Sequence, residues 1–299
     1  MRGTIIKGIA GFYYVWAEGT VYECRARGIF KKNGMTPLVG DDVELTVIAG
    51  PGMQPSASSP EMGVGSVDSI LPRLNHFDRP PVANVELMVL VASVKHPAPS
   101  LLMLDRVSVA AQQKNAGLVV VVNKTDLAGP RQLEELSGHY RGVYPLILVS
   151  ALDGTGLDEL KSFLHGKKAA LAGPSGVGKS TLANLLLGEE KSVTGEISRK
   201  LGRGRNTTRH SELFKGDGFF LFDTPGFTSF ENIGLASRDA ASYFPDIAKH
   251  AGGCRFSDCR HISEPDCSVR KAVEEGLISK TRYESYKEIY KAAVEAEKY

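Results

Sequence analysis

The sequence predicts a multidomain protein with a small β-barrel, an α/β domain built on a parallel sheet, and a small α-helical domain. Three observations indicate this. Residues 1 to about 75 alternate β-rich runs with turn residues, apolar strands alternate with helical segments from about residue 80, and the chain becomes helical and polar after about residue 232. We expect domain boundaries of 1–75, 76–232 and 233–299. A chain of 299 residues is long enough for two or three domains.

The composition is that of an ordinary globular protein, with 42% hydrophobic and 23% charged residues. A formal net charge of +2 is weak evidence for nucleic acid, because a basic binding surface would have to be local. The sequence contains no uncharged run of 18 or more apolar residues, and its N-terminal segment is not a convincing signal peptide. We therefore expect a cytoplasmic protein that does not insert in a membrane.

The N-terminal region reads as short strands within 3–17, 20–28, 41–50 and 65–73, a pattern that fits a five-stranded barrel. The run "GFYYVW" places four aromatic side chains in the first of these ranges. Alternate residues face opposite sides of a strand, so we expect some of them to fill the barrel and others to be exposed. Core filling is the default, and stacking on RNA bases is the alternative. The four residues are Phe12, Tyr13, Tyr14 and Trp16.

The run "GPSGVGKS" follows an apolar strand and precedes a helix, and it matches the phosphate-binding pattern G-x-x-x-x-G-K-[ST] in full. Glycines let backbone N–H groups turn toward phosphate oxygens, and the helix N-terminus favours negative charge. We expect Lys179 to reach the β- and γ-phosphates as a catalytic group, and Ser180 to ligate Mg²⁺. The expected phosphate-site residues are Gly173, Pro174, Ser175, Gly176, Val177, Gly178, Lys179, Ser180 and Thr181.

A second nucleotide motif, "NKTD", follows the apolar run "GLVVVV". The Asp126 carboxylate can accept hydrogen bonds from N1–H and the exocyclic amine of guanine, a donor pair that adenine lacks. Asn123 and Lys124 would brace the site, with the lysine stem along the base. Ser150 and Ala151 follow the next strand, where a backbone N–H can reach the guanine oxygen.

Two further segments bear on the γ-phosphate. "DTPG" ends an apolar strand, so that Asp223 can hold the Mg²⁺ shell and the Gly226 N–H can approach the phosphate. In "GRGRNTTRH", Thr208 is expected to complete the Mg²⁺ coordination, as in the switch I loop of GTPases. The surrounding segment 199–215 is strongly basic, and is either a solvated loop or an RNA phosphate contact.

The C-terminal region carries the spacing C-x4-C-x-H-x5-C. Three thiolates and an imidazole form a tetrahedral zinc set, and four protein ligands close the site, which favours a structural metal. Cys24 stands apart in a strand and is expected in the core. The expected zinc ligands are Cys254, Cys259, His261 and Cys267.

The nucleotide motifs occur here in an order that is cyclically permuted from that of ordinary GTPases. Along the chain the order is the guanine motif, the Ser-Ala pair, the phosphate loop, Thr208 and Asp223. With the N-terminal barrel and the Cys/His cluster, the chain closely resembles the RsgA (YjeQ/YloQ) family of circularly permuted GTPases. The resemblance covers nearly the whole chain. It implies an OB-fold, a permuted GTPase domain and a zinc domain. It also implies GTP hydrolysis that is stimulated by the small ribosomal subunit, its rRNA being a partner, during late maturation of that subunit. We expect a monomer.

Two positions affect the catalytic assignment. Phe227 follows "DTPG" where many GTPases have a glutamine that orients water, and an apolar ring cannot do so by hydrogen bonding. Asn206 stands where the family usually has a histidine before the two switch I threonines. An asparagine can position a water but is not a general base near pH 7. Asn206 is therefore the candidate for orienting the water, with His210 or an external group as alternatives.

The alternative functions are an RNA-binding or RNA-remodelling module whose nucleotide site only modulates affinity, and a P-loop ATPase or kinase. RNA affinity that is independent of nucleotide would favour the first. The NKTD motif argues against the second, because Asp126 has no donor pair to accept from adenine.

Overall fold

The computed structural model describes residues 1–28, 30, 34–53, 62–188, 211–223, 227 and 234–298. The chain forms two compact units. The first unit comprises Met1–Met88, Leu160–Leu171 and Ser180–Phe227, and the second comprises Val89–Glu159, Ala172–Lys179 and Thr228–Tyr299.

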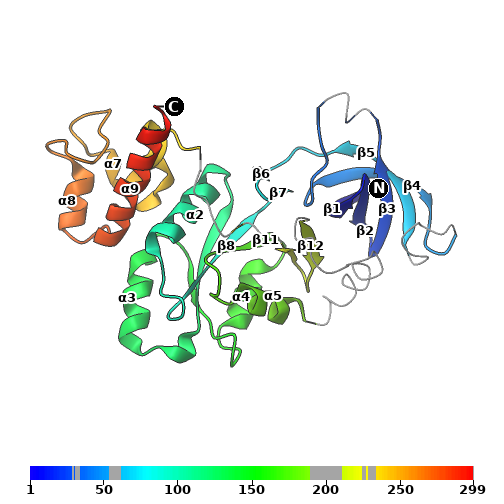
Figure 1. The fold of residues 1–299 in the computed structure, drawn as a ribbon, viewed down its shortest axis with the longest axis horizontal. Coiled ribbons are helices and arrows are strands. Elements are labelled where there is room, and N and C mark those ends of the chain that lie inside the picture. The colour runs from blue at the N-terminus through cyan, green and yellow to red at the C-terminus, as the bar shows by residue number, and fades with distance from the viewer. Residues whose placement is uncertain are drawn as a thin grey trace. The chain divides into compact units, whose positions relative to one another are not determined.

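The first unit begins with a closed barrel of five strands, drawn in blue in Figure 1. These strands are β1 (Arg2–Ile9), β2 (Phe12–Ala17), β3 (Thr20–Ala26), β4 (Asp42–Ala49) and β5 (Gly63–Ile70). The barrel closes because β1 pairs with β4 as well as with β2. Its core includes Ile5, Val15 and Cys24, each fully buried. The expected five-stranded barrel is confirmed, with range 3–17 split into two strands by a turn of positive φ at Ala10 and Gly11.

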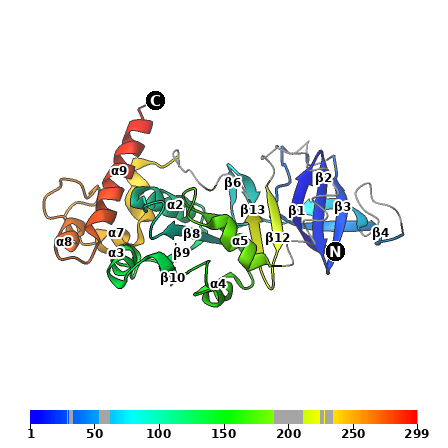
Figure 2. The ribbon, with the colours of Figure 1, turned by 60° about the horizontal axis from the view of Figure 1, so that its bottom comes forward.

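The same unit continues from the barrel into a second set of strands (Figure 2). The strand β12 (Glu212–Lys215) pairs with β1 through Lys7 and Glu212, and antiparallel with β13 (Phe220–Asp223). β13 pairs in parallel with β11 (Lys168–Ala172). The last four residues of the basic segment 199–215, Glu212–Lys215, therefore form a strand. The short strands β6 (His76–Asp78) and β7 (Pro81–Ala83) form a hairpin, and helix α4 spans Leu157–Leu164.

The barrel contacts these strands at several polar and close-packed points. Lys168 Nζ lies 2.6 Å from both carboxylate oxygens of Asp42. Gly40 has a φ of +95°, and a Cβ there would lie 2.1 Å from the Ala83 carbonyl oxygen and 2.7 Å from the Phe222 ring. Only glycine fits this position, both for its backbone conformation and for the available space.

The second unit contains the parallel strands predicted for the α/β domain. These are β8 (Leu87–Ser93), β9 (Gly117–Asn123) and β10 (Leu146–Leu148), with helices α2 (Leu101–Gln113) and α3 (Pro130–Tyr140). β9 and β10 pair in parallel, and all residues of β8 are buried. Such continuous apolar strands are typical of a sheet covered on both faces.

The C-terminal part of this unit is helical, as the sequence predicts (Figure 1). It consists of η2 (Ser237–Tyr243), α7 (Pro245–Ala251), α8 (Ser268–Glu274) and α9 (Lys280–Ala296). One face of α9, with Tyr286 and Ile289, shares a core with Phe244 and with Val109 of α2. Within the described part of the chain, no helix is long and apolar enough to cross a membrane.

A buried ionic cluster joins these C-terminal helices to α2 and α3. Arg282 on α9 is fully buried, with Nη1 2.6 Å from Asp105 Oδ1 and Nε 2.8 Å from Asp246 Oδ2. His139 Nε2 lies 3.1 Å from Asp105 Oδ2, and the Tyr140 hydroxyl donates to Asp105 Oδ1 at 3.0 Å. Burial alone would lower the pKa of Arg282, but the two carboxylates outweigh it and raise that pKa. We call these residues the Arg282 cluster.

Candidate functional site

Asn123 joins two loops of the second unit that are far apart in sequence. It is the last residue of β9 and is 1% exposed. Its Nδ2 donates to the Val177 carbonyl at 2.8 Å, and its Oδ1 accepts from the Ala151 N–H at 3.2 Å. Because one amide side chain satisfies both loops, the "NKTD", "SA" and "GPSGVGKS" segments meet at one place.

Lys124 and Asp126 lie beside this junction. Lys124 has a φ of 65°, which turns the chain out of the strand, and its Nζ donates to the carbonyls of Gly176 at 2.8 Å and of His96. Asp126 is exposed, and one of its carboxylate oxygens accepts from the Ser150 hydroxyl at 2.9 Å. Among the described residues, no side chain forms a hydrogen bond with the other Asp126 oxygen.

The phosphate loop runs from β11 to α5 (Lys179–Leu187) and depends on glycine at two crowded points. Gly173 has a φ of +135°, and a Cβ there would lie 2.2 Å from the Val91 carbonyl oxygen. Gly178 has a φ of +99°, and a Cβ there would lie 2.4 Å from Asn123 Nδ2. Both glycines are therefore required by the backbone conformation and by close contact with neighbouring strands.

Lys179 folds back over this loop. Its Nζ donates to the carbonyls of Gly173 at 2.8 Å and of Pro174 at 2.6 Å. Burial lowers the pKa of Lys179. Among the described residues, two neutral carbonyls hold the ammonium, so an anion that enters the loop would supply an opposite charge.

The remaining nucleotide and magnesium candidates divide into two groups. Ser180 and Thr181 occupy the first turn of α5, and Asp223 ends β13. Asn206, Thr208, His210 and Gly226 lie outside the described residues. Phe227 is 1% exposed and packs edge-on against Phe77, with ring centroids 5.3 Å apart. The ring of Phe227 is thus part of the core.

The four cysteine and histidine residues of the C-terminal region converge, with all ligand atoms within 4.8 Å of one another. Cys254 Sγ lies 3.8 Å from Cys267 Sγ and 3.4 Å from His261 Nδ1, and Cys267 Sγ lies 3.5 Å from that nitrogen. Around a tetrahedral zinc, two sulfurs lie about 3.8 Å apart, and a sulfur and a nitrogen about 3.5 Å apart. The donor set and its spacing therefore fit a zinc ion.

Side chains from α9 and the metal loop itself hold this site in place. The hydroxyls of Tyr283 and Tyr286 donate to the carbonyls of His261 and Arg260. The Glu264 carboxylate accepts three backbone N–H groups of the loop, including those of Arg260 and Ile262. Such outer contacts orient metal ligands.

Sequence reasoning did not find these supporting residues. Tyr283 and Tyr286 stand three positions apart in the C-terminal helix, and their hydroxyls are the signal that the sequence offered, since a buried tyrosine O–H needs an acceptor. The His96 carbonyl, which holds Lys124, offers no signal in the sequence because any residue has a carbonyl.

Together these features define a class. A phosphate loop tied by one asparagine to a base-recognition motif that precedes it in the chain is the site of a GTP-binding protein with permuted motif order. Comparison with known families is more specific. The RsgA GTPase family matches residues 70–233, and the RsgA N-terminal domain matches residues 2–50. The chain belongs to the RsgA family of GTPases.

Relatives and solved structures agree over nearly the full length. The chain is 39% identical to the small ribosomal subunit biogenesis GTPase RsgA of Agathobacter rectalis, with 100% of both chains covered. It is 44% identical to the protein of the same name from Alkaliphilus metalliredigens, with 95% of each covered. YjeQ from Thermotoga maritima matches with a TM-score of 0.81 and 33% identity over 98% of both chains. YloQ, a circularly permuted GTPase, matches with a TM-score of 0.79 and 33% identity over 99% of this chain and 95% of YloQ.

Proposed function

We propose that this chain hydrolyses GTP to GDP and phosphate, that the small ribosomal subunit stimulates the reaction, and that it serves late maturation of that subunit. The observation that carries the proposal is the junction at Asn123, which places a guanine-type motif against a phosphate loop. The names of the relatives, small ribosomal subunit biogenesis GTPases, support the choice of partner.

We assign the base to the guanine motif. The Asp126 oxygen that is not bonded to Ser150 would accept from guanine N1–H or the exocyclic amine, while the Ser150 bond fixes the carboxylate. The Lys124 stem would lie along the base, since its ammonium is held by the carbonyls of Gly176 and His96. The Ala151 N–H, which here donates to Asn123 Oδ1 at 3.2 Å, would turn toward the guanine oxygen when the base binds.

We assign the phosphates to residues 173–181. The N–H groups of the loop would surround the β-phosphate, and Lys179 would leave the carbonyls of Gly173 and Pro174 for the β- and γ-phosphate oxygens. Ser180 and Thr208 would ligate Mg²⁺, with Asp223 in its shell and the Gly226 N–H near the γ-phosphate. The magnesium ion would neutralise charge that develops on the phosphate oxygens.

In the hydrolysis step a water oxygen bonds to the γ-phosphorus, and the bond from that phosphorus to the β–γ bridging oxygen breaks. Phe227 is packed in the core against Phe77, which supports the view that its side chain takes no part in orienting the water. Asn206 is our candidate for that role. A slow basal rate follows, since no glutamine follows "DTPG".

The other assignments follow the division of the chain. The barrel, 1–75, would contact rRNA, residues 76–232 would form the permuted GTPase domain, and residues 233–299 would hold one structural zinc through Cys254, Cys259, His261 and Cys267. A cytoplasmic monomer is the simplest state for a protein that acts on free small subunits.

The test is the GTPase rate of the purified chain with and without purified small ribosomal subunits. A rate that rises with subunits supports the proposal, and equal rates would remove the stimulated function. RNA affinity that is the same in the apo, GDP and GTP-analogue forms would instead favour the RNA-binding module. The Asp126→Asn variant is the control for specificity, because it should weaken GTP and favour xanthosine triphosphate.

A further inference from the structure

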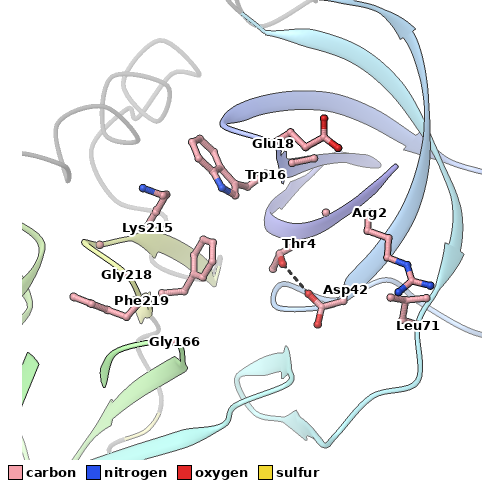
Figure 3. A pocket seen from close by; sticks show the side chains of 14 residues that line it. Arg2, Thr4, Trp16, Glu18, Asp42, Leu71, Gly166, Lys215, Gly218 and Phe219 are labelled. Atoms are coloured by element: carbon pink, nitrogen blue, oxygen red, sulfur yellow. Dashed lines mark hydrogen bonds between the residues drawn. The ribbon is translucent and has the colours of Figure 1, made fainter. Parts of the chain in front are cut away.

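The first unit holds a cavity of about 510 Å³ that is lined by both the barrel and the β12–β13 hairpin (Figure 3). Arg2, Thr4, Trp16 and Glu18 come from β1, β2 and the turn that follows, and Lys215 ends β12. This volume lies within the range of pockets that hold a small organic ligand. Neither the nucleotide site nor the zinc site uses any of these residues.

Trp16 presents an aromatic face to this cavity. Its neighbours Val15 and Ala17 belong to the barrel core, whereas Trp16 is half-buried and is not part of that core. Residues next to each other in a strand point to opposite faces, so the indole lies outside the barrel. In Figure 3 the indole lies between the Lys215 ammonium and Glu18. Trp16 is thus one of the aromatic residues of this run that face away from the barrel core, whereas Tyr13 packs against that core.

Lys215 lies over the face of the Trp16 indole. Its Nζ lies 5.3 Å from the centroid of the Trp16 ring. Across the residues that the structure describes, Lys215 forms no ion pair. A lysine ammonium over a partly exposed ring is a weak contact, and its flexible stem can move aside. The side chain is thus poised to exchange the indole for a phosphate.

The acidic groups of the cavity do not oppose an anion equally. Asp42 is neutralised by Lys168, with both oxygens 2.6 Å from Nζ, and it also accepts from the Thr4 hydroxyl at 2.7 Å. Glu18 is exposed beside the indole and can accept from the amino group of a base. The cavity therefore offers a stacking face, an acceptor and a mobile cation side by side.

We propose that this cavity binds an unpaired nucleobase of single-stranded RNA, stacked on Trp16, with an adjacent phosphate on Lys215. The inference rests on the proposed function, in which rRNA is a partner, and it adds a defined contact that the function does not require. Stacking on one aromatic side chain strengthens RNA binding by about 5- to 150-fold. A gain of that size is too small to retain a free nucleotide and fits one contact of a longer strand.

The place of the cavity gives this contact a consequence. Lys215 pairs with Phe220 and Glu212 pairs with Asp223 in the β12–β13 hairpin. A base that rests on this hairpin contacts the strands that lead to Asp223, the Mg²⁺ candidate. We therefore expect loss of the contact to reduce stimulation by small subunits and to leave the basal GTPase rate unchanged.

The experiment uses Trp16 as its own probe, because the chain contains one tryptophan. The full-length protein is titrated with an eight-residue oligoadenylate, an adenine ligand that the guanine motif does not select, and tryptophan emission is followed. Stacking should quench the emission in a saturable way. Binding of a fluorescently labelled copy of the RNA is followed in parallel by anisotropy.

Variants separate the pocket from other RNA contacts. Trp16→Ala should weaken the RNA by about 5- to 150-fold, Trp16→Phe by less, and Lys215→Gln should weaken it and reduce the quenching. Lys287→Gln is the matched control, since Lys287 Nζ lies 5.2 Å from the Tyr283 ring in the other unit. It removes the same charge and a similar contact, together with an ion pair to Glu284 at 2.7 Å, and should change neither RNA affinity nor quenching.

Two outcomes would overturn the inference. In the first, anisotropy shows that the RNA binds, but tryptophan emission does not change and Trp16→Ala binds the RNA with the affinity of the parent protein. The other is adenosine monophosphate that quenches with the affinity of the oligonucleotide, which would identify a free nucleotide as the ligand. Small subunits that still stimulate the GTPase would then leave the proposed function intact. Absence of stimulation in the unmodified protein would refute that function whatever the emission shows.

Discussion

Each unit contains ion pairs of its own, and one pair from each unit differs from the other in its access to water. In the first unit Lys168 bonds to Asp42, whose side chain is 42% exposed. In the second unit Arg282 and Asp105 are both 0% exposed. A pair that water reaches is weak and is screened by salt, whereas a buried pair has no solvent to replace a lost partner. The Lys168–Asp42 pair should therefore depend on salt, and the Arg282 pairs of α9 should not. The barrel also has a buried ion pair to β12, between Lys7 and Glu212, whose side chains are 7% and 9% exposed.

Removal of zinc should have the largest effect. It tests whether the buried contacts of α9 also hold the loop of residues 254–267 in place. A closed site of this kind contributes about 10–16 kcal/mol to the folding of small zinc peptides at pH 7. Chelation should therefore abolish the hydrogen-exchange protection of residues 254–267, while the Arg282 cluster keeps α9 protected. Equal loss of protection in α9 would show that the metal, and not the cluster, holds the helix.

Thiol counting is the control for metal removal. Burial, followed by the nearby Glu23 and Asp68 carboxylates, raises the pKa of Cys24 to about 12. At pH 8 this thiol should stay unreactive toward a disulfide reagent, because the reactive form is the thiolate. Chelation should release three reactive thiols, those of Cys254, Cys259 and Cys267. A fourth fast thiol would contradict the burial of Cys24.

Breaking the Arg282 cluster should have the next largest effect. Arg282→Met leaves Asp105 buried without its cation, and removal of one partner of such a pair costs about 3–5 kcal/mol. Hydrogen exchange of α9 and α2 amides measures the loss as a free energy of local unfolding. Arg282→Lys should also destabilise, since one ammonium cannot reproduce the separate bonds to Asp105 and Asp246.

The Lys168–Asp42 pair should give a smaller and salt-sensitive effect. In a double-mutant cycle of Lys168→Ala and Asp42→Ala, the coupling energy should be about 1 kcal/mol at low salt and less in 0.5 M salt. Chemical denaturation of the barrel reports it. A coupling that exceeds that of the Arg282–Asp105 pair would reverse the comparison.

The smallest effect is expected for an exposed pair of the same kind. Arg131 and Glu135 on α3 have side chains 92% and 66% exposed, at a spacing of four residues. Their coupling energy should be about 0.3–0.5 kcal/mol, and it sets the baseline for the other two pairs. A coupling energy near that of the Lys168–Asp42 pair would mean that partial burial does not strengthen the Lys168–Asp42 pair.

The sequence predicted those parts of the molecule whose chemistry is local. The phosphate loop and the zinc ligands were found because residue type and spacing within about 15 positions define them. The Arg282 cluster could not be found, since its Arg and Asp are 177 positions apart and neither stands in a motif. The strand at 212–215 was not predicted either, because its strand character depends on pairing with β1 and β13.

The hydrogen bond from Asn123 to Val177 also determines when the site can form during translation. The base-recognition segment leaves the translating ribosome 54 residues before the carbonyl that its asparagine must meet. At about 5–20 residues per second that interval is roughly 3–11 seconds. In the usual order of motifs the phosphate loop is synthesised first, and the base-recognition segment, synthesised later, completes the nucleotide site. Here Asn123 and Lys124 of the base-recognition segment lack the carbonyls of Val177 and Gly176 until the phosphate loop emerges, so that the proposed nucleotide site forms only then.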